Sequence, residues 1–507
     1  MKILVIQLAR FGDIYQSWPT LRAMKRKFPR AEIHILVRKS FVEALEGIGV
    51  DVHVHQLDTA NILETLFSSQ VNIETALSKI VEFTNKLQLL EFDRIVNLSF
   101  SPFSSYLVKA ISRKKTQLKG YTRHSDGYLS IPDDPSAYFY AQVGVGRMNR
   151  IHLTEIFASI AEVELCDQDW LLIEYQRNTS HKDQIFEKFG IPLSKEYVVL
   201  HVGASDSRRT LKAEGWGKVC SKLLKWWKGQ IVLVGSPDEV TSSQRISEVV
   251  QSERVYSLVG KTRLTELFPI LSSASIVVGG DSVVMQMSSL AQVECFNLSF
   301  SLANFWETGP REPGSRVLVL CTSENADIDF IAKEIWYMIE GLAPANQVAL
   351  ATGDSPVWYQ YDGLSENDEF SWDLIRALYL GYEFPAVISE LQQHGFQRIY
   401  ELSEVAIAQI GMINKKRTRS VAINILDQVD SLWGSIRRLV PELDPLISWF
   451  ETEKLRIGPG PIQELVDRTR KVFESLKLVA SLYTTAHETI TCQELEGKGN
   501  VGNDLVS

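Results

Sequence analysis

The chain has 507 residues, of which 45% are hydrophobic, so it is long enough to bury more than one hydrophobic core. Its net charge of −9 and the absence of a recognised nucleic-acid motif exclude nucleic acid as the expected partner. The five cysteines are scattered without C-x-x-C spacing, which argues against a zinc module or a disulfide scaffold.

Positive charge is concentrated near the start of the chain. Residues 1–155 contain 20 Lys and Arg against 15 Asp and Glu, a net charge of +5, which leaves −14 for the remainder. The basic clusters are Arg22–Arg30, Val37–Lys39 and Ser112–Lys119. They are suited to phospholipid headgroups or a phosphorylated acceptor, and they are equally compatible with ordinary solvated helix faces.

Membrane insertion is not expected from the sequence. No segment approaches the ~18 unbroken apolar residues of a membrane span, and the opening run "MKILVIQL" is too short for a signal peptide. The sequence therefore predicts a cytoplasmic protein, and the basic clusters leave contact with the inner face of a membrane open.

The first region, residues 1–170, alternates short apolar runs with helical patterns. Strands are expected at Lys2–Leu8, Glu32–Arg38 and Asp93–Phe100, separated by segments long enough for crossover helices. This alternation is typical of βαβ units and predicts a parallel sheet.

The second region, residues 171–342, repeats that pattern more clearly. We expect buried parallel strands at Tyr197–Gly203, Gln230–Ser236, Ala274–Ser282, Val293–Ser299 and Arg316–Cys321. The two regions together predict an α/β fold made of two Rossmann-like domains that face each other across a central cleft.

The remaining chain has a different character. Residues 343–367 are expected to form a loop-like linker, and residues 368–495 show apolar positions at three- and four-residue spacing, which predicts a C-terminal α-helical domain. This domain could bind an acceptor protein or mediate oligomerisation. Residues 496–507 lack apolar periodicity and are expected to be disordered.

Ligands of open α/β sheets bind at the carboxyl ends of the strands, so the turn after the first strand is a candidate site. In "ARFGDIYQSWPTL", Gly12 allows a close turn and Asp13 lies where a helix is expected to begin. Asp13 is interpreted either as a helix N-cap or as a general base that faces the cleft. A carboxylate at a helix N-terminus also tends to stay ionised.

Two turns in the second region combine polar side chains with backbone amides. After the strand at Tyr197–Gly203 come Ser205, Arg208 and Arg209, a set suited to a phosphate or diphosphate. The stretch "VVGGDSVVMQMSSLAQ" places Asp281 at a second strand-to-helix junction, where the alternative is a capped helix.

The order and spacing of these blocks resemble glycosyltransferase family 9, the heptosyltransferases, over roughly residues 1–342. The blocks that carry the resemblance are "KILVIQLARFGDIYQSWPTLRAMKRKFPRAEIHILV", "VVLHVGAS", "RR", "EGW", "IVLVGSPDE", "LVGKTRLTELFPILSSASIVVGGDS" and "WETGP". The resemblance implies the two-domain GT-B fold and an inverting, metal-independent transfer of a sugar from a nucleotide-diphosphate donor such as ADP-heptose, with no cofactor. It also implies a bacterial protein whose acceptor is a glycolipid of the lipopolysaccharide type or a protein.

The resemblance assigns a role to each matching position. Asp13 would be the catalytic base, with Arg10 and Gly12 on the acceptor side. The donor and nucleotide would be bound by Gly203, Ser205, Arg208, Arg209, Glu239, Asp281, Ser282 and Gln286. No metal site is expected, because the Asp-x-Asp patterns at 167–169 and 327–329 do not follow an expected active-site strand.

The sequence departs from the family at one block. The usual Asp-Thr-Gly-x-x-His reads Asp281 to Gln286 here, so that the glycine and the histidine are replaced. Arg209 stands where a lysine is usual. These changes keep open an alternative function, a catalytically weakened GT-B protein that binds a sugar nucleotide or a partner.

Overall fold

The computed structural model describes residues 1–67, 71–145, 148–173, 176, 178–204, 206–300, 303–320, 322–324, 326–344, 349–350, 357–360, 366–413 and 417–484. The chain divides into two compact units. The first unit comprises Met1–Ile80 and Ile151–Leu364, and the second comprises Val81–Arg150 and Ser365–Ser507. This division differs from the boundaries expected at residues 170 and 342, which remain a proposal.

The first unit opens with parallel strands. β1 (Lys2–Ile6) pairs with β2 (Glu32–Arg38), and β2 pairs with β3 (His53–Leu57). β1 and β2 match the expected strands, whereas the polar sequence "HVHQL" of β3 gave no strand signal. Between β1 and β2 runs α1 (Phe11–Lys27), in which every residue from Ile14 to Met24 is buried. The second crossover contains the short helix η1 (Lys39–Leu45).

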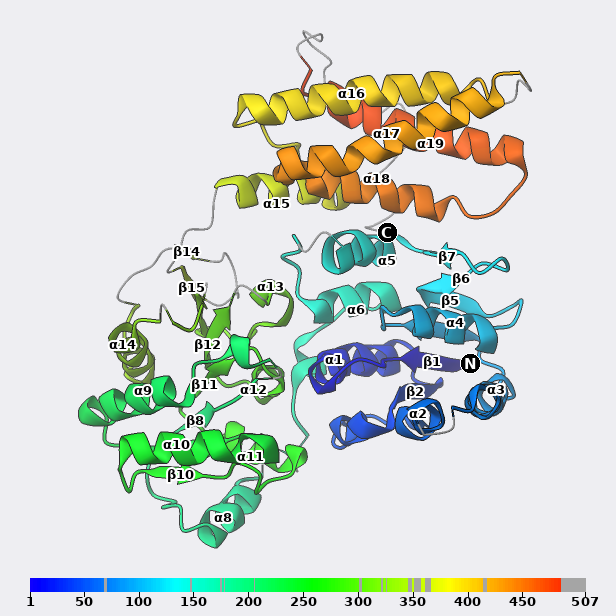
Figure 1. Cartoon of the computed structure of the whole chain (residues 1–507). Helices are drawn as coiled ribbons and strands as arrows, with labels where there is room; N and C mark the ends of the chain where they lie inside the picture. Colours follow the sequence, from blue (N-terminus) through cyan, green and yellow to red (C-terminus); the bar gives the residue numbers. More distant parts are fainter. Residues whose placement is uncertain are drawn as a thin grey trace. The chain divides into compact units, whose positions relative to one another are not determined.

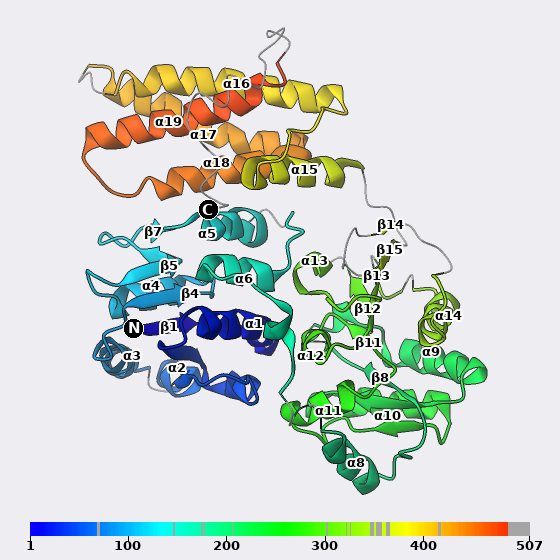
Figure 2. The same cartoon turned by 180° about the vertical axis from the view of Figure 1, so that it is seen from behind.

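A second sheet in the same unit has eight strands in the order β10-β9-β8-β11-β12-β13-β15-β14 (Figures 1 and 2). All its pairs are parallel except β14 with β15. The strands are β8 (Tyr197–His201), β9 (Gln230–Val234), β10 (Val255–Ser257), β11 (Ile276–Gly280), β12 (Cys295–Phe300), β13 (Arg316–Leu320), β14 (Ala349–Leu350) and β15 (Val357–Gln360).

In chain order the first six strands have the Rossmann arrangement 3-2-1-4-5-6, so the strand order reverses between β8 and β11. The five strands expected in the second region correspond to β8, β9, β11, β12 and β13. The segment expected to be a linker, by contrast, contributes β14 and β15 to the sheet. These strands were not predicted, because such short strands show too little periodicity in the sequence.

Helices connect and cover this second sheet. They are α8 (Thr179–Lys188), η4 (Ser207–Arg209), α9 (Ala213–Trp226), η5 (Pro237–Glu239), α10 (Val240–Val250), η6 (Leu264–Glu266), α11 (Leu267–Leu271), α12 (Val283–Ala291), α13 (Phe305–Thr308) and α14 (Ile328–Ile339). Two preceding helices, α6 (Leu153–Ala161) and η3 (Asp167–Trp170), pack against α1 instead. The core forms where apolar side chains of α9 and α14, such as Trp216 and Ile331, pack on buried strand residues such as Leu233 and Phe296. This packing fixes the strand ends that carry the candidate site.

The second unit contains a small β region and the helical domain. β4 (Arg94–Asn97) pairs in parallel with β5 (Gln117–Gly120), and β6 (Thr122–Arg123) pairs antiparallel with β7 (Leu129–Ser130). The shorter helices are α4 (Pro102–Ile111), α5 (Asp134–Tyr138) and η2 (Phe139–Val145). α2 (Thr59–Phe67) belongs to the first unit, and α3 (Ile73–Gln88) carries the chain from the first unit into the second.

The expected helical domain is present as α15 (Glu366–Leu380), α16 (Glu390–Ile410), α17 (Arg419–Leu439), η7 (Pro441–Leu443), α18 (Asp444–Arg456) and α19 (Ile462–Ser481). α16 packs against α17 and α19, and α18 packs against α15 and α19 (Figure 2). Trp433, Phe450 and Phe473 are buried between these helices. The tail at 496–507 lies outside the described residues. Over the part of the chain described, no helix is both long and apolar enough to cross a membrane.

Candidate active site

A cavity of about 1180 Å³ lies in the first unit, between the loops that follow β1 and β2 and those that follow the strands of the second sheet. The first wall includes Arg10, Phe11, Gly12, Asp13, Gln16, Arg38, Phe41 and Glu43. The second wall includes His201, Ala204, Arg209, Ser236, Glu239, Arg263, Asp281, Ser282, Gln286 and Thr308. The second wall therefore lies at the carboxyl ends of β8 and β11, where the strand order reverses.

Asp13 is held at the start of α1. Arg10 occupies the N-cap position, and its backbone N–H donates to Asp13 Oδ2 at 3.1 Å. Asp13 is thus the third helical residue and not the N-cap that was considered from the sequence. Burial raises the pKa of Asp13, and the Arg10 N–H together with the charges of Arg10 and Arg38 partly offsets that rise. A helix N-terminus alone would lower the pKa of a carboxyl group, so the net shift of the Asp13 pKa has the opposite direction. A raised pKa makes the carboxylate a stronger base.

Arg38 is a cavity residue that sequence reasoning assigned only to a surface cluster. It ends β2, its Nη2 donates to the Ala9 carbonyl at 3.1 Å, and its guanidinium lies 4.4 Å from the centre of the Phe41 ring. The charge of Arg38 also lowers the pKa of Asp13. The available signal was its position directly after a buried strand, which is where ligand-binding residues of such sheets occur.

The loop after β8 places two neighbouring arginines in different surroundings. Arg208 is exposed and forms an ion pair with Asp206, with Nη2 2.6 Å from Oδ2, and it does not line the cavity. Arg209 lines the cavity. Gly280 permits this arrangement, since a Cβ at Gly280 would lie 2.2 Å from the Arg209 carbonyl oxygen. Ser205 lies outside the described residues.

Glu239 lies on the cavity wall with one carboxylate oxygen already engaged. Its Oε2 accepts from the Ser236 backbone N–H at 2.7 Å and lies 3.8 Å from Nε2 of His201. Gly203 does not line the cavity, but it leaves room for this carboxylate. A Cβ at Gly203 would lie 1.6 Å from Glu239 Oε1. Burial lowers the pKa of His201, against the opposing charge of Glu239.

Asp281 follows β11 and is buried beneath the cavity surface. Oδ1 accepts from Asn297 Nδ2 at 3.2 Å, and Oδ2 accepts from the Ser299 hydroxyl at 3.2 Å. Burial raises the pKa of Asp281 to about 6, although the charge of Arg209 acts in the opposite direction. Asp281 is therefore partly protonated in mildly acidic solution.

Ser282 is the N-cap of α12, and its side chain makes no capping hydrogen bond. The start of this nine-residue helix, including Val283 and Val284, lies on the cavity wall. The first backbone N–H groups of a helix lack intrahelical acceptors, so this position is suited to an anion.

Gln286 connects the two walls. Its Nε2 donates to the Thr308 carbonyl, and its Oε1 lies 3.3 Å from the place that a Cβ on Gly12 would occupy. α1 and α12 are in contact at this point. Gly12 is thus the residue that lets Gln286 approach the first turn of α1.

Further contacts between the walls involve residues that sequence reasoning did not select. Arg263 Nη2 donates to Glu46 Oε2 at 2.8 Å, and the Leu264 backbone N–H donates to Glu43 Oε1 at 3.1 Å. Gln16 Nε2 donates to the Glu307 carbonyl at 3.1 Å. Such contacts join segments more than 200 residues apart, and no local sequence pattern encodes them.

The structure brings most of the expected site residues together. Arg10, Gly12, Asp13, Arg209, Glu239, Asp281, Ser282 and Gln286 line one cavity, whereas Gly203 and Arg208 do not. Of the two Asp-x-Asp patterns set aside above, Asp169 forms an ion pair with Arg26 at 2.7 Å and Asp327 caps α14. Each thus has a structural role.

The fold has two α/β regions with parallel sheets, and the second sheet has the Rossmann strand order. A cavity lies between the two regions. This arrangement is the GT-B class of glycosyltransferase fold. The sequence model of glycosyltransferase family 9 (heptosyltransferase) matches residues 80–289, which confirms the resemblance seen in the sequence. That match supports sugar transfer as the class of activity. It begins after Asp13 and therefore does not test the role expected for Asp13.

The chain is also similar to individual proteins. A putative glycosyltransferase of Haemophilus influenzae is 20% identical over 297 residues, which cover 57% of this chain and 79% of the relative. The crystal structure of a family 9 glycosyltransferase from Veillonella parvula superposes with a TM-score of 0.51 at 14% identity, covering 67% of this chain and 97% of that one. The structure of ADP-heptose lipopolysaccharide heptosyltransferase II of E. coli has a TM-score of 0.49 at 14% identity, covering 67% and 99%.

Proposed function

We propose that this protein is an inverting, metal-independent glycosyltransferase that moves a heptose or a related sugar from a nucleotide-diphosphate donor to an acceptor hydroxyl. The observation that carries the proposal is the single cavity that collects Asp13 from one wall and Arg209, Asp281 and Ser282 from the other. The heptosyltransferase description of the matching family favours a heptose donor such as ADP-heptose.

In this mechanism Asp13 is the general base. It removes the proton of the acceptor hydroxyl while the acceptor oxygen forms a bond to the anomeric carbon and the bond from that carbon to the diphosphate breaks. Attack from the face opposite the leaving group inverts the anomeric configuration. The raised pKa of the half-buried Asp13 carboxylate favours proton acceptance, and the Arg10 N–H holds this carboxylate in place.

Negative charge that develops on the departing diphosphate needs compensation, and the cavity offers it without a metal. Arg209 contributes a guanidinium, the start of α12 contributes backbone N–H groups, and Asp281 is able to donate a hydrogen bond when protonated. Preorganised donors of this kind stabilise a transition state in which charge moves onto the leaving group. Glu239 would contact the nucleoside with its second oxygen.

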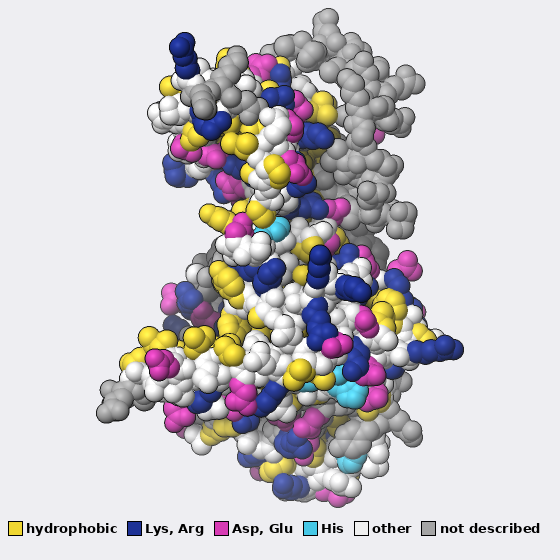
Figure 3. Space-filling model, turned by 90° about the vertical axis from the view of Figure 1, so that its right-hand side faces the viewer, with side chains coloured by type: hydrophobic (Ala, Val, Ile, Leu, Met, Phe, Trp, Pro, Cys, Tyr) yellow, Lys and Arg dark blue, Asp and Glu magenta, His cyan; other side chains and the backbone are white. Residues whose placement is uncertain are grey.

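The acceptor is proposed to be a glycolipid of the lipopolysaccharide type or a protein. Basic residues support the first choice, since Arg113, Lys114 and Lys115 are exposed and Figure 3 shows Lys and Arg side chains grouped on one face. Such a face suits anionic headgroups at the inner surface of a membrane. The helical domain supports the second choice, because it offers additional surface for a protein acceptor or for a second copy of the chain.

The experiment that tests the proposal measures sugar transfer with a panel of nucleotide-diphosphate sugars and lipid or protein acceptor fractions. Donor binding is measured separately by the ligand-induced shift of the unfolding temperature. Arg209→Ala is expected to weaken binding of the nucleotide diphosphate, and Arg208→Ala is the matched control because Arg208 lies outside the cavity. Equal affinities of the two variants would contradict the donor site.

Gln286 favours one alternative, a GT-B protein that binds a sugar nucleotide or a partner with little turnover. Its amide nitrogen already donates to Thr308, and so it is a poorer donor to a diphosphate than a freely placed side chain. Stoichiometric binding of a nucleotide sugar without transfer to any acceptor fraction would support this alternative. Transfer that depends on Asp13 would exclude it.

A further inference from the structure

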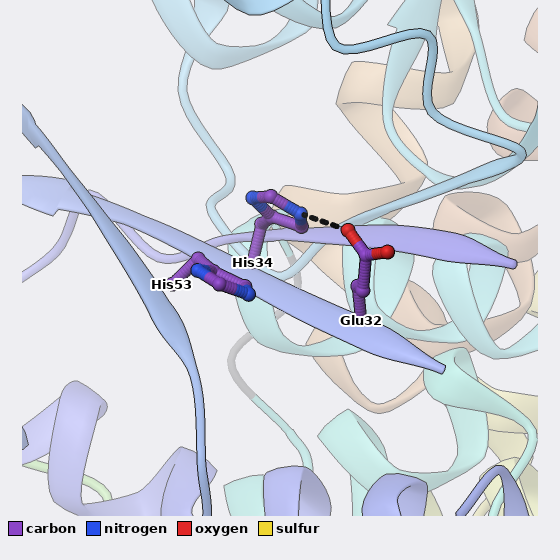
Figure 4. A group of neighbouring side chains, drawn as sticks. All are labelled: Glu32, His34 and His53. Carbon is purple, nitrogen blue, oxygen red and sulfur yellow. Dashed lines mark ion pairs between the residues drawn. The ribbon is translucent and has the colours of Figure 1, made fainter. Parts of the chain in front are cut away.

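A group of histidines lies on β2 and β3, outside the candidate active site. His34 on β2 lies directly opposite His53 on β3 in the parallel register. Glu32 is two residues before His34, and His55 is two residues after His53, so the alternation of side chains in strands places all four on one face of the sheet. Figure 4 shows Glu32, His34 and His53 next to one another.

The distances within this group are those of a nearly assembled metal site. One ligand atom each from Glu32, His34 and His53 lies within 4.8 Å of the other two, and His34 Nε2 is 3.9 Å from Glu32 Oε2. Two ligand atoms bound to the same tetrahedral zinc ion are about 3.4 Å apart, so small side-chain rotations are sufficient. We propose that Glu32, His34 and His53 bind a divalent zinc ion.

His55 completes the arrangement as an outer partner. Nδ1 of His34 lies 2.9 Å from Nε2 of His55, and the two rings are stacked with centres 5.2 Å apart. When Nδ1 of His34 carries the proton and donates to His55, the lone pair of His34 is on Nε2, the atom nearest Glu32. Imidazole ligands of metals are usually oriented by such a second hydrogen bond.

The chemistry of the ligands favours zinc over magnesium or calcium. Imidazole nitrogens suit zinc and other late first-row ions, whereas magnesium and calcium prefer oxygen ligands alone. Burial lowers the pKa of His34 to about 4, and this agrees with a neutral imidazole at neutral pH. Three protein ligands leave one tetrahedral position for water, and Lys2, whose Nζ is 3.8 Å from Glu32 Oε2, would give way to the ion.

The position of the site separates it from the proposed transfer reaction. Glu32 begins β2 and Arg38, a cavity residue, ends it, so the two lie about 20 Å apart along an extended strand. β3 is the last strand at this edge of its sheet. The ion would therefore link the edge strand β3 to β2 and stabilise the fold, without a role in sugar transfer.

The test uses the full chain without a polyhistidine tag, stripped of metal with a chelator and dialysed. Zinc chloride is titrated by calorimetry, with magnesium chloride as the comparison. We expect one zinc ion per chain, no response to magnesium, and a higher unfolding temperature with zinc. Absence of zinc binding would overturn the proposal.

Variants locate the site. His53→Ala and Glu32→Gln alter exposed residues and are expected to weaken zinc affinity more than His55→Gln, for which a loss of roughly 10–100-fold is expected. His394→Ala, an exposed histidine of α16, is the matched control and should bind zinc as the unaltered chain does. Circular dichroism checks the fold of each variant. Zinc binding unchanged in both His53→Ala and Glu32→Gln would refute the site.

Discussion

The two walls of the cavity hold their carboxylates in different ways. On the wall formed by β8 and β11, Asp281 accepts two side-chain hydrogen bonds and Glu239 accepts a backbone N–H, beside His201. On the wall formed by α1, Asp13 accepts one backbone N–H and lies in the field of two arginines. Both oxygens of Asp281 are thus fixed by neighbouring side chains, whereas Asp13 is the carboxylate that we propose as the proton acceptor.

This difference separates residues whose loss should affect turnover from residues whose loss should affect binding or stability. The comparison also separates the arginines, because Arg10 and Arg38 act on Asp13 whereas Arg209 acts on Asp281.

Asp13→Asn is expected to have the largest effect. The amide keeps an oxygen for the Arg10 N–H but cannot take a proton, so kcat for transfer should fall by roughly 10²–10⁴-fold while donor affinity stays unchanged. The unaltered enzyme should lose activity as the pH falls through the raised pKa of Asp13, with an acidic limb above the ordinary aspartate range. Initial rates of transfer across pH measure both effects.

Asp58→Asn is the control for this substitution, since Asp58 is a surface carboxylate paired with Lys39 and does not line the cavity. Transfer by Asp13→Asn at more than a tenth of the unaltered rate would remove Asp13 from the mechanism.

Arg209→Ala changes the opposite wall and should affect binding first. A hydrogen bond to a charged group contributes about 1.5–3 kcal/mol, so the dissociation constant of the nucleoside diphosphate should rise roughly 10–150-fold. Calorimetry on Arg209→Ala and Arg208→Ala measures the difference. Arg208→Ala should bind as the unaltered chain does, because its guanidinium is paired with Asp206 outside the cavity.

Asp281→Asn should affect stability in a pH-dependent way. The pKa of Asp281 rises from 3.8 to about 6 on folding, so the unfolded chain loses its proton first and folding becomes less favourable as the pH rises between these values. Above pH 6 the native chain carries the whole free-energy cost of burying the charged carboxylate. Asparagine has no charge at this position, so we expect this variant to be more stable at pH 7 by roughly 1–3 kcal/mol.

At pH 4 the stabilities of Asp281→Asn and the unaltered chain should lie much closer together, because the native carboxyl is then protonated and the unfolded carboxyl is about half protonated. Urea unfolding at both pH values measures this difference. An equal difference at the two pH values would show that Asp281 is not the titrating group.

Much of this site could be predicted because the signals are local. Asp13, Arg209 and Asp281 each follow a strand whose apolar run is visible in the sequence, and parallel strands bring their carboxyl ends to one edge. Apolar runs likewise predicted the main strands of both sheets, and apolar residues at three- and four-residue spacing predicted the helical domain.

What could not be predicted depends on contacts between distant segments. Arg208 and Arg209 are adjacent and chemically alike, yet only Arg209 of the two lines the cavity, where its backbone lies against Gly280, a residue far away in the sequence. The direction in which the pKa of Asp13 shifts likewise depends on the burial of its side chain in the folded chain, which raises the pKa. β3 was missed because its histidines interrupt the apolar pattern, and one of them, His53, is a ligand of the proposed zinc site.

The smallest effect is expected from Arg263→Ala, which removes the ion pair with Glu46 across the two walls. Both side chains are more than half exposed, so solvent screens the pair and its loss should lower the free energy of unfolding by less than about 1 kcal/mol. The backbone hydrogen bond from Leu264 to Glu43 and the packing of Phe268 against Tyr15 and Trp18 remain to hold the walls. Urea unfolding of Arg263→Ala with Phe268→Ala for comparison tests this ranking, since truncation of the fully buried Phe268 should cost about 3–5 kcal/mol. A larger loss from Arg263→Ala than from Phe268→Ala would mean that charge, and not apolar packing, joins the two walls.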